Sequence, residues 1–298
     1  MARRRRGRSA VRFLFLLLIA GAVFGLGLWL GHRRPAPPAA PAATARPAPR
    51  PVAPAAPPPA APTVIAEPSG PPTRARVALV IDDLGGSLEP AERLLALGVP
   101  VTGAILPFER HSAEVAARLR ASGVEVIVHL PMEPTGEQDP GPQAVLERWR
   151  PRRIAALTER AIESVPGATG LNNHMGSLIT ADEEPMRAVL GVVARHGLYF
   201  LDSRTTAETH AFDWARELGI PAVRRDVFLD DDPAPAAIAG QFARLLEQAR
   251  ARGAAVAIGH PHPGTLAVLA REIPRARAAG VEFVPVSYLL ERSESLPE

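Results

Sequence analysis

From residue 74 onward, short apolar runs alternate with longer amphipathic ones, and this alternation constrains the fold more than any other feature. The apolar runs predict strands at 77–81, 101–106, 124–128, 170–171, 198–201, 221–223, 254–258 and 281–284. The amphipathic runs predict helices at 88–96, 111–121, 151–164, 184–195, 207–218, 235–252 and 266–279. Seven or eight βα units in one domain indicate a parallel barrel or a large doubly wound sheet. We expect the barrel, because polar residues recur behind so many of the strands.

The first 34 residues predict a membrane anchor. Six arginines precede residues 13–30, and those 18 residues carry no charge. A helix of that length spans roughly 27 Å, close to the thickness of the bilayer core. A cleaved signal peptide is the alternative, but its apolar region is usually about 7 to 15 residues long. By the positive-inside rule, we expect a single transmembrane helix in the inner membrane, with the C-terminal domain in the periplasm.

Residues 35–73 predict a disordered linker. Positions 35–72 contain 15 prolines and 13 alanines, with no aromatic residue to start a core. A chain of this composition stays extended, largely as polyproline II. We therefore expect a spacer between the anchor and one domain at 74–298.

The basic charge of the chain belongs to its N-terminal part. All 34 basic residues are arginines, eight of them lie in residues 1–34, and acidic residues outnumber arginines after residue 72. The charge therefore gives no argument for nucleic-acid binding, and we expect no nucleic-acid partner. The chain has no cysteine, so a metal site would have to use imidazole and carboxylate ligands.

Two adjacent carboxylates, Asp82 and Asp83, follow the strand predicted at 77–81, and two glycines follow them. Chemistry in parallel α/β folds lies at the carboxyl ends of strands, so the pair is a candidate site. One carboxylate could bind a metal while its neighbour accepts a proton. The structural alternative is that Asp83 caps the next helix and Asp82 is a solvated loop residue.

Further polar residues follow later strands in the same way. They are His129, His174, Asp202, His260 and His262. Asp83, His129 and His174 form a plausible set of one carboxylate and two histidines, suited to zinc or another divalent first-row ion. Three protein ligands would leave positions for water and a substrate oxygen.

Five segments, taken in order, resemble the divergent polysaccharide deacetylase family: the IDD after the first strand, VHLPMEP, LNNHMGS, FLDSRT and GHPHPGT. The resemblance covers residues 74–288 and implies a distorted (β/α) barrel related to metal-dependent carbohydrate esterases. It implies that Asp82 is the general base and Asp83 a metal ligand. The general acid falls on His260, with His262 as the other candidate. The implied reaction is hydrolysis of an N- or O-acetyl group on a glycan.

The sequence departs from the superfamily at its His-x-x-x-His motif. The first histidine falls on His129, whereas the second falls on Glu133. Either Glu133 or His174 could be the third ligand. We favour His174, because prolines on both sides of Glu133 disfavour a helical approach to the same ion.

Two other acidic positions have weaker assignments. Asp202 could orient the imidazole of His260, with Arg204 keeping that carboxylate charged. The run at 230–232 indicates a helix N-cap and a solvated turn, and is a second candidate for a metal or sugar contact.

Three functions fit these residues. The first is a membrane-anchored deacetylase of a cell-envelope glycan such as peptidoglycan. The second is an inactive barrel that binds envelope glycan or protein, favoured by the missing histidine and by the low aromatic content of 5%. The third is hydrolysis of another ester, such as a phosphoester, for which Arg204, Arg224 and Arg225 are the available cations.

Overall fold

The computed structural model describes residues 74–293. The predicted membrane anchor and the predicted linker lie outside these residues. Among the helices described, none combines the length and the apolar character needed to cross a membrane.

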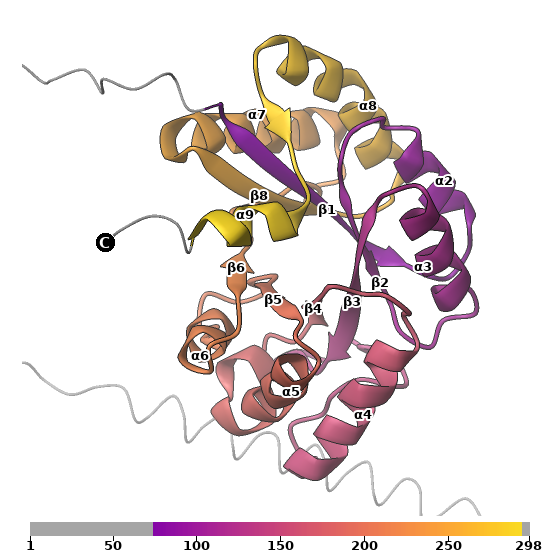
Figure 1. The fold of residues 1–298 in the computed structure, drawn as a ribbon, viewed down its shortest axis with the longest axis vertical. Helices are drawn as coiled ribbons and strands as arrows, with labels where there is room; N and C mark the ends of the chain where they lie inside the picture. Colours follow the sequence, from indigo (N-terminus) through magenta and orange to yellow (C-terminus); the bar gives the residue numbers. More distant parts are fainter. Residues whose placement is uncertain (1–73, 294–298) are drawn as a thin grey trace, which may run out of the picture. The chain divides into compact units, whose positions relative to one another are not determined.

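A single sheet of parallel strands organises the described domain (Figure 1). The strands are β1 (Arg76–Leu84), β2 (Thr102–Ile105), β3 (Glu125–Met132), β4 (Gly170–Met175), β5 (Tyr199–Asp202), β6 (Ala222–Arg224), β7 (Val227–Phe228), β8 (Ala254–Gly259) and β9 (Glu282–Phe283). Their order is β6-β5-β4-β3-β2-β1-β8-β7, and β9 pairs with the start of β1. The eight predicted strands are confirmed, and β7 is an addition.

The two edges of this sheet are joined by one short stretch of chain. The amide of Arg225 donates to the carbonyl of Asp202 at the end of β5 (3.0 Å), whereas the next amide, of Asp226, donates to the carbonyl of Val256 in β8 (2.9 Å). The chain thus leaves one edge and joins the other within two residues. The sheet curls as the expected distorted barrel does, and that prediction is confirmed.

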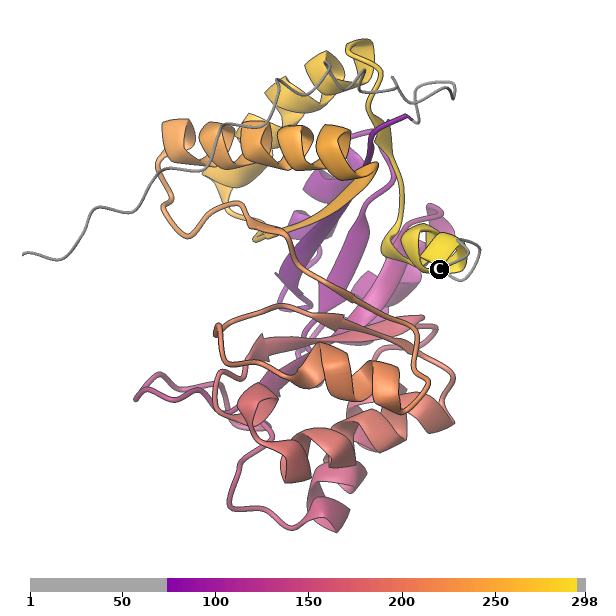
Figure 2. The same cartoon turned by 90° about the vertical axis from the view of Figure 1, so that its left-hand side faces the viewer.

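Helices cover the convex face of the sheet (Figures 1 and 2). They are α2 (Glu89–Leu95), α3 (Ser112–Ala121), α4 (Pro151–Glu163), α5 (Glu183–Arg195), α6 (Ala211–Glu217), α7 (Pro235–Arg252) and α8 (Pro263–Ala278), with a 3₁₀ turn at η1 (Ile179–Ala181). Three of them, α4, α7 and α8, begin with proline, which is favourable in the first turn because its missing N–H would have no partner there. A final helix, α9 (Val286–Ser293), is not predicted from the sequence.

The apolar core has two layers, separated by the sheet. The larger layer lies between the strands and the outer helices. The smaller one lies on the concave side, where Val80, Ile127 and Ile258 pack with Val286 and Leu290 of α9. Each fully buried aliphatic side chain of this kind contributes about 1.5–3 kcal/mol. Because side chains alternate along a strand, this inner layer also identifies which polar residues face inward further along each strand.

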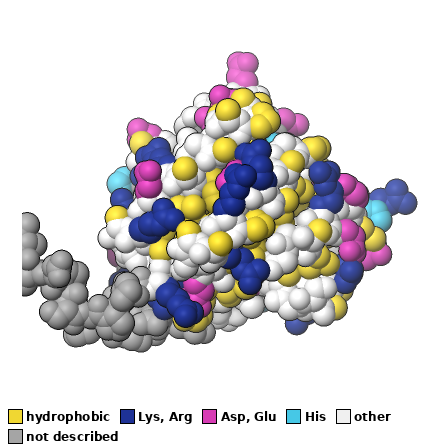
Figure 3. Space-filling model, turned by 90° about the horizontal axis from the view of Figure 1, so that it is seen from above, with side chains coloured by type: hydrophobic (Ala, Val, Ile, Leu, Met, Phe, Trp, Pro, Cys, Tyr) yellow, Lys and Arg dark blue, Asp and Glu magenta, His cyan; other side chains and the backbone are white. Residues whose placement is uncertain are grey.

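On one face of the molecule, charged side chains of both signs lie close together (Figure 3). On the face shown in Figure 3, arginines and carboxylates are interspersed among apolar side chains.

Candidate functional site

Strand alternation brings the candidate residues together at the carboxyl ends of the strands. Asp82 follows inward-facing Val80 by two positions, and His129 follows inward-facing Ile127 in the same way. His260 stands two residues beyond inward-facing Ile258. Asp82 and His129 are only 3% and 1% exposed, so they lie at the floor of the site.

The side chain of Asp83 lies in the same site as that of Asp82 because strand β1 is irregular at this point. Alternation alone would turn Asp83 away from Asp82. Its φ of 57° is left-handed, and the β1–β2 pairing shifts register between Ile81 and Leu84. A bulge of this kind re-aims a side chain, and both carboxylates therefore serve one site. Leu84 returns to the outer apolar layer.

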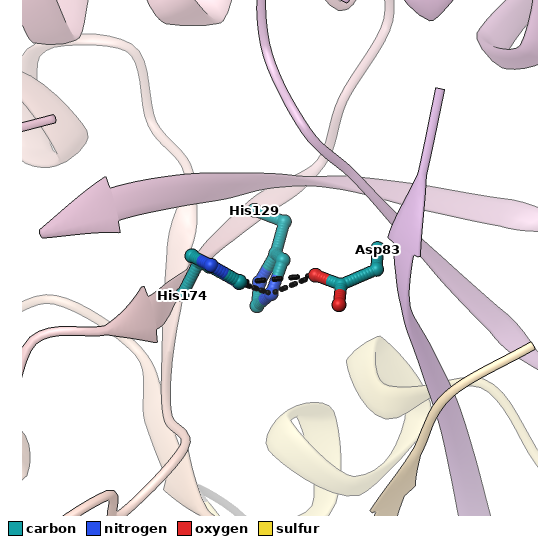
Figure 4. Close-up of side chains that lie close together, drawn as sticks. All are labelled: Asp83, His129 and His174. Carbon is teal, nitrogen blue, oxygen red and sulfur yellow. Dashed lines mark hydrogen bonds and ion pairs between the residues drawn. The ribbon is translucent and has the colours of Figure 1, made fainter. Parts of the chain in front are cut away.

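Asp83, His129 and His174 converge on a single point (Figure 4). Oδ1 of Asp83 lies 3.2 Å from Nε2 of His129 and 3.0 Å from Nδ1 of His174. The two imidazole nitrogens lie 3.1 Å apart. With bonds of about 2.0–2.2 Å to an ion, ligand atoms stand roughly 3.0 Å apart at right angles and roughly 3.4 Å apart in a tetrahedron. The three atoms therefore fit one divalent ion and leave its opposite side open.

The donor set itself favours a cation. Oδ1 of Asp83 is buried and has no hydrogen-bond partner, although two imidazole nitrogens face it. A buried acceptor without a partner is costly, and an ion at the convergence point would satisfy it. One carboxylate and two imidazoles without sulfur suit zinc and similar first-row ions.

Asn172 fixes the orientation of His129. Its Oδ1 accepts from Nδ1 of His129 (2.9 Å), which leaves Nε2 directed at Asp83 and His174. Its Nδ2 donates to Oδ1 of Asp82 (3.0 Å) and to Oγ of Ser203 (3.2 Å). One amide thus links the histidine of the candidate metal site to the neighbouring carboxylate. Supporting bonds of this kind set the tautomer and position of a ligand.

The charges of the site are strongly coupled. Burial raises the pKa of Asp82, so this carboxylate is more basic than an exposed one. Burial also favours a raised pKa at Asp83, but His129 and His174 outweigh it and lower the pKa of Asp83. Burial opposes protonation of His129, yet the charges of Asp82 and Asp83 raise its pKa to about 9.

His260 lies across the site from the histidine pair. Its Nε2 is 3.7 Å from Oδ2 of Asp83. Its Nδ1 faces Oδ1 of Asp230 at 3.0 Å, and Oδ2 of Asp230 accepts from the His260 amide and from Thr265 Oγ1, each at 2.7 Å. Burial lowers the pKa of His260, but the Asp230 hydrogen bond and the charge of Asp83 outweigh it and raise the pKa.

The expectation that Asp202 orients His260 is therefore wrong, because Asp230 has that position. Asp202 accepts from the Arg204 amide (2.8 Å) and from Thr209 Oγ1 (2.9 Å), so it binds the backbone of Arg204 and not its guanidinium. Leu201 faces the inner layer, and alternation turns Asp202 away from it. The side chain of Asp230 is fully buried, so the expectation of a solvated turn at 230–232 is also wrong for this residue.

The remaining candidates lie beside the metal-site residues. Glu133 accepts from the Glu147 amide at 2.7 Å and is absent from the convergent group, which contains His174. His262 is exposed at the start of α8, and its ring stacks on His260 with centroids 5.6 Å apart. Asp230, His260 and His262 form a second group of potential ligands.

The fold and site together define a deacetylase-type barrel, and the comparisons agree. The family model for divergent polysaccharide deacetylases matches residues 79–290, and the chain belongs to this family. It is 38% identical over 201 residues to the uncharacterized protein YibQ of Escherichia coli (strain K12), covering 67% of this chain and 63% of that protein. The match thus spans less than two thirds of that relative's length.

Two further proteins are similar to this chain. The chain is 32% identical over 196 residues to an uncharacterized protein of Haemophilus influenzae, covering 66% of this chain and 70% of that one. Among solved structures, the uncharacterized protein ATU2773 from Agrobacterium tumefaciens C58 is similar, with a TM-score of 0.69 and 25% identity. That similarity covers 72% of this chain and 89% of the other.

Proposed function

We propose that this protein is a metal-dependent hydrolase that removes N- or O-acetyl groups from a cell-envelope glycan. The observation that carries the proposal is the convergence of Asp83, His129 and His174, with Asp82 and His260 beside them. Membership of the divergent polysaccharide deacetylase family supports a carbohydrate as the substrate.

Asp83, His129 and His174 would hold the ion, and zinc is the metal that this ligand set suits best. A divalent ion in this position lowers the pKa of a coordinated water and polarises an acyl carbonyl.

Asp82 is the proposed general base. Its Oδ2 lies 3.5 Å from Nε2 of His129, so it is adjacent to the convergence point while Asn172 holds its other oxygen. Its raised pKa makes it a stronger proton acceptor than an ordinary carboxylate. The base is therefore fixed in position before the substrate arrives.

His260 is the proposed general acid. Asp230 holds Nδ1, which leaves Nε2 directed toward the site. The raised pKa keeps the imidazole protonated to a higher pH, as an acid that protonates a leaving amine or alcohol requires.

Acetate release by the metal-loaded full-length chain from acetylated oligosaccharides tests this proposal. Asp82→Asn should reduce turnover by about 10²–10⁴-fold, since that is what general acid–base catalysis contributes. Asp213→Asn, an exposed residue of α6, is the matched control and should retain activity. Glycan binding without any acetate release would overturn the proposal and favour an inactive, glycan-binding barrel.

We also propose that the chain is anchored in the inner membrane with this domain in the periplasm. The charge-free segment 13–30, preceded by arginines, supports this location. A reporter enzyme that works only in the periplasm should be active when it is fused after Glu298. Protease resistance of the C-terminal region in spheroplasts would contradict it.

A further inference from the structure

A polar cleft of about 540 Å³ adjoins the candidate site. Ser203 and Arg204 after β5, Arg225 and Phe228 around β7, and Gln241 and Arg244 of α7 contribute to its lining. Ser203 Oγ accepts from Asn172, which also bonds Asp82. The ring of Phe228 lies 5.4 Å from the ring of His260. Two lining residues of the cleft, Ser203 and Phe228, therefore connect it to the proposed base through Asn172 and to the proposed acid.

The charge of the cleft is predominantly positive. Arg204, Arg225 and Arg244 face two carboxylates, Asp226 and Asp231. Asp226 is already engaged, because it accepts from the Val256 amide (2.8 Å) and forms an ion pair with Arg252 (3.2 Å). Three guanidinium groups thus remain against the single carboxylate of Asp231 within the cleft.

Arg225 is held in place by the backbone rather than by an acidic partner. Its Nε donates to the carbonyl of Ser203 (2.6 Å) and its NH2 group to the carbonyl of Arg204 (2.7 Å). Its guanidinium also lies 5.0 Å from the centre of the Phe228 ring. Burial lowers the pKa of Arg225 and the charge of Arg204 lowers it further, whereas the charges of Asp202, Asp82 and Asp231 only partly offset this. Two like charges held close together raise the energy of the cleft, and a bound anion would relieve this repulsion.

We infer that this cleft binds an anionic group, a carboxylate or a phosphate, carried by the glycan substrate. The inference deepens the proposed function and rests on it. Guanidinium groups recognise both anions through paired, charge-assisted hydrogen bonds, so the chemistry is shared. The substrate class is accordingly an acidic acetylated glycan in place of a neutral one.

Binding measurements on the purified full-length chain distinguish a phosphate from a carboxylate as the bound anion. The probes are N-acetylglucosamine, its 6-phosphate and N-acetylmuramic acid, which adds a carboxylate to the same neutral sugar. Calorimetric titration at low salt should show at least one acidic sugar binding about tenfold more tightly than the neutral sugar, as charge-assisted hydrogen bonds predict. Which sugar binds more tightly identifies the anion. Equal affinities for all three probes would overturn the inference.

Arg244→Ala supplies the residue-level test. Arg244 is exposed on α7, so its removal should leave the fold intact, and Arg250→Ala on the same helix is the matched control. We expect Arg244→Ala to reduce the preference for the acidic sugar about three- to tenfold, leaving neutral-sugar affinity and metal content unchanged. An unchanged preference, or an equal loss in Arg250→Ala, would contradict the inference.

The inference and the proposed function can fail separately. Acetate release from neutral oligosaccharides, without any preference for acidic sugars, would overturn the inference and leave the deacetylase proposal standing. Preferential binding of acidic sugars that depends on Arg244, without acetate release from any glycan, would support the cleft assignment and remove the deacetylase proposal.

Discussion

Nε2 of His129 and Nδ1 of His174 face each other 3.1 Å apart, and both face the same oxygen of Asp83. Two neutral imidazole nitrogens with lone pairs at this separation repel each other unless a proton or a cation lies between them. An N–H proton of one ring or a cation therefore lies between the two nitrogens. In the metal-free chain, the charges of Asp82 and Asp83 raise the pKa of His129 and so favour a proton on this ring.

His129→Ala should abolish binding of zinc at the convergent group. Mutating a residue that only supports a ligand typically lowers metal affinity about 10- to 100-fold. Removing one of three ligands should lower metal affinity by more than that. Metal content of the purified full-length chain, measured by mass spectrometry, checks this. His111→Ala, at an exposed pair with Glu114, should retain the metal. Full zinc content in His129→Ala would exclude this ligand set.

The metal-free protein should lose stability as the pH rises through about 9. The pKa of His129 is raised to about 9 in the folded state, from an ordinary value of 6.5. A group whose pKa is higher in the folded state than in the unfolded state stabilises the fold fully at pH values below its unfolded pKa. That stabilisation is lost as the pH rises through its folded pKa. The loss should therefore fall between pH 6.5 and 9.

Thermal unfolding of metal-free wild type and His129→Gln measures this effect. The stability difference between them should shrink across that pH window, because glutamine does not titrate. A difference that stays constant would mean that His129 carries no extra proton in the folded chain.

Asp230→Asn should shift the alkaline limb of the pH–rate profile to lower pH. Asp230 stabilises protonated His260, and an amide would stabilise it less, so the acid would lose its proton earlier. Metal binding at Asp83, His129 and His174 should not change, since Asp230 lies outside that group. Asp202→Asn is the matched control and should leave the profile in place, because Asp202 bonds Arg204 and Thr209. Identical shifts in both variants would contradict the assignment to Asp230.

The sequence predicts most of the barrel, because apolar runs such as 77–81 are long enough to identify a buried strand. It misses β7, the two-residue strand Val227–Phe228. That omission explains the error over Asp202. Phe228 packs with the inner layer, so Asp230, two residues later, must also face inward. Strand alternation applied to Leu201 would likewise have excluded Asp202.

The inward orientation of Asp83 and the role of Asn172 could not be predicted from the sequence, because both depend on how neighbouring strands pair. The pair Asp82 and Asp83 is visible in the sequence, but alternation predicts that only one of them faces the site. The bulge that re-aims Asp83 depends on the register between β1 and β2, which is a long-range property. The role of Asn172 has the same origin, since it depends on β4 pairing with β3 so that Asn172 lies beside His129.

The region from residue 74 should fold without the preceding residues. Within the described residues 74–293, the strands and helices already form two apolar layers. Residues 74–298 alone should therefore be soluble and unfold in a single cooperative transition on heating. Circular dichroism of this fragment checks the prediction, and an unfolded fragment at room temperature would refute the boundary.

The left-handed backbone at Asp83 leads to a last prediction, which separates its conformational role from its role as a ligand. At φ 57°, asparagine is tolerated, whereas a β-branched residue is strained. Both Asp83→Asn and Asp83→Val should lose most zinc affinity, because neither keeps the carboxylate. In metal-free protein, however, Asp83→Val should be less stable than Asp83→Asn by about 1–2 kcal/mol, the cost of a left-handed residue with a bulky Cβ. Chemical denaturation of the two metal-free variants measures this difference. Equal stabilities would mean that the bulge relaxes when its side chain changes, so that the left-handed backbone at this position is not strained by a β-branched residue.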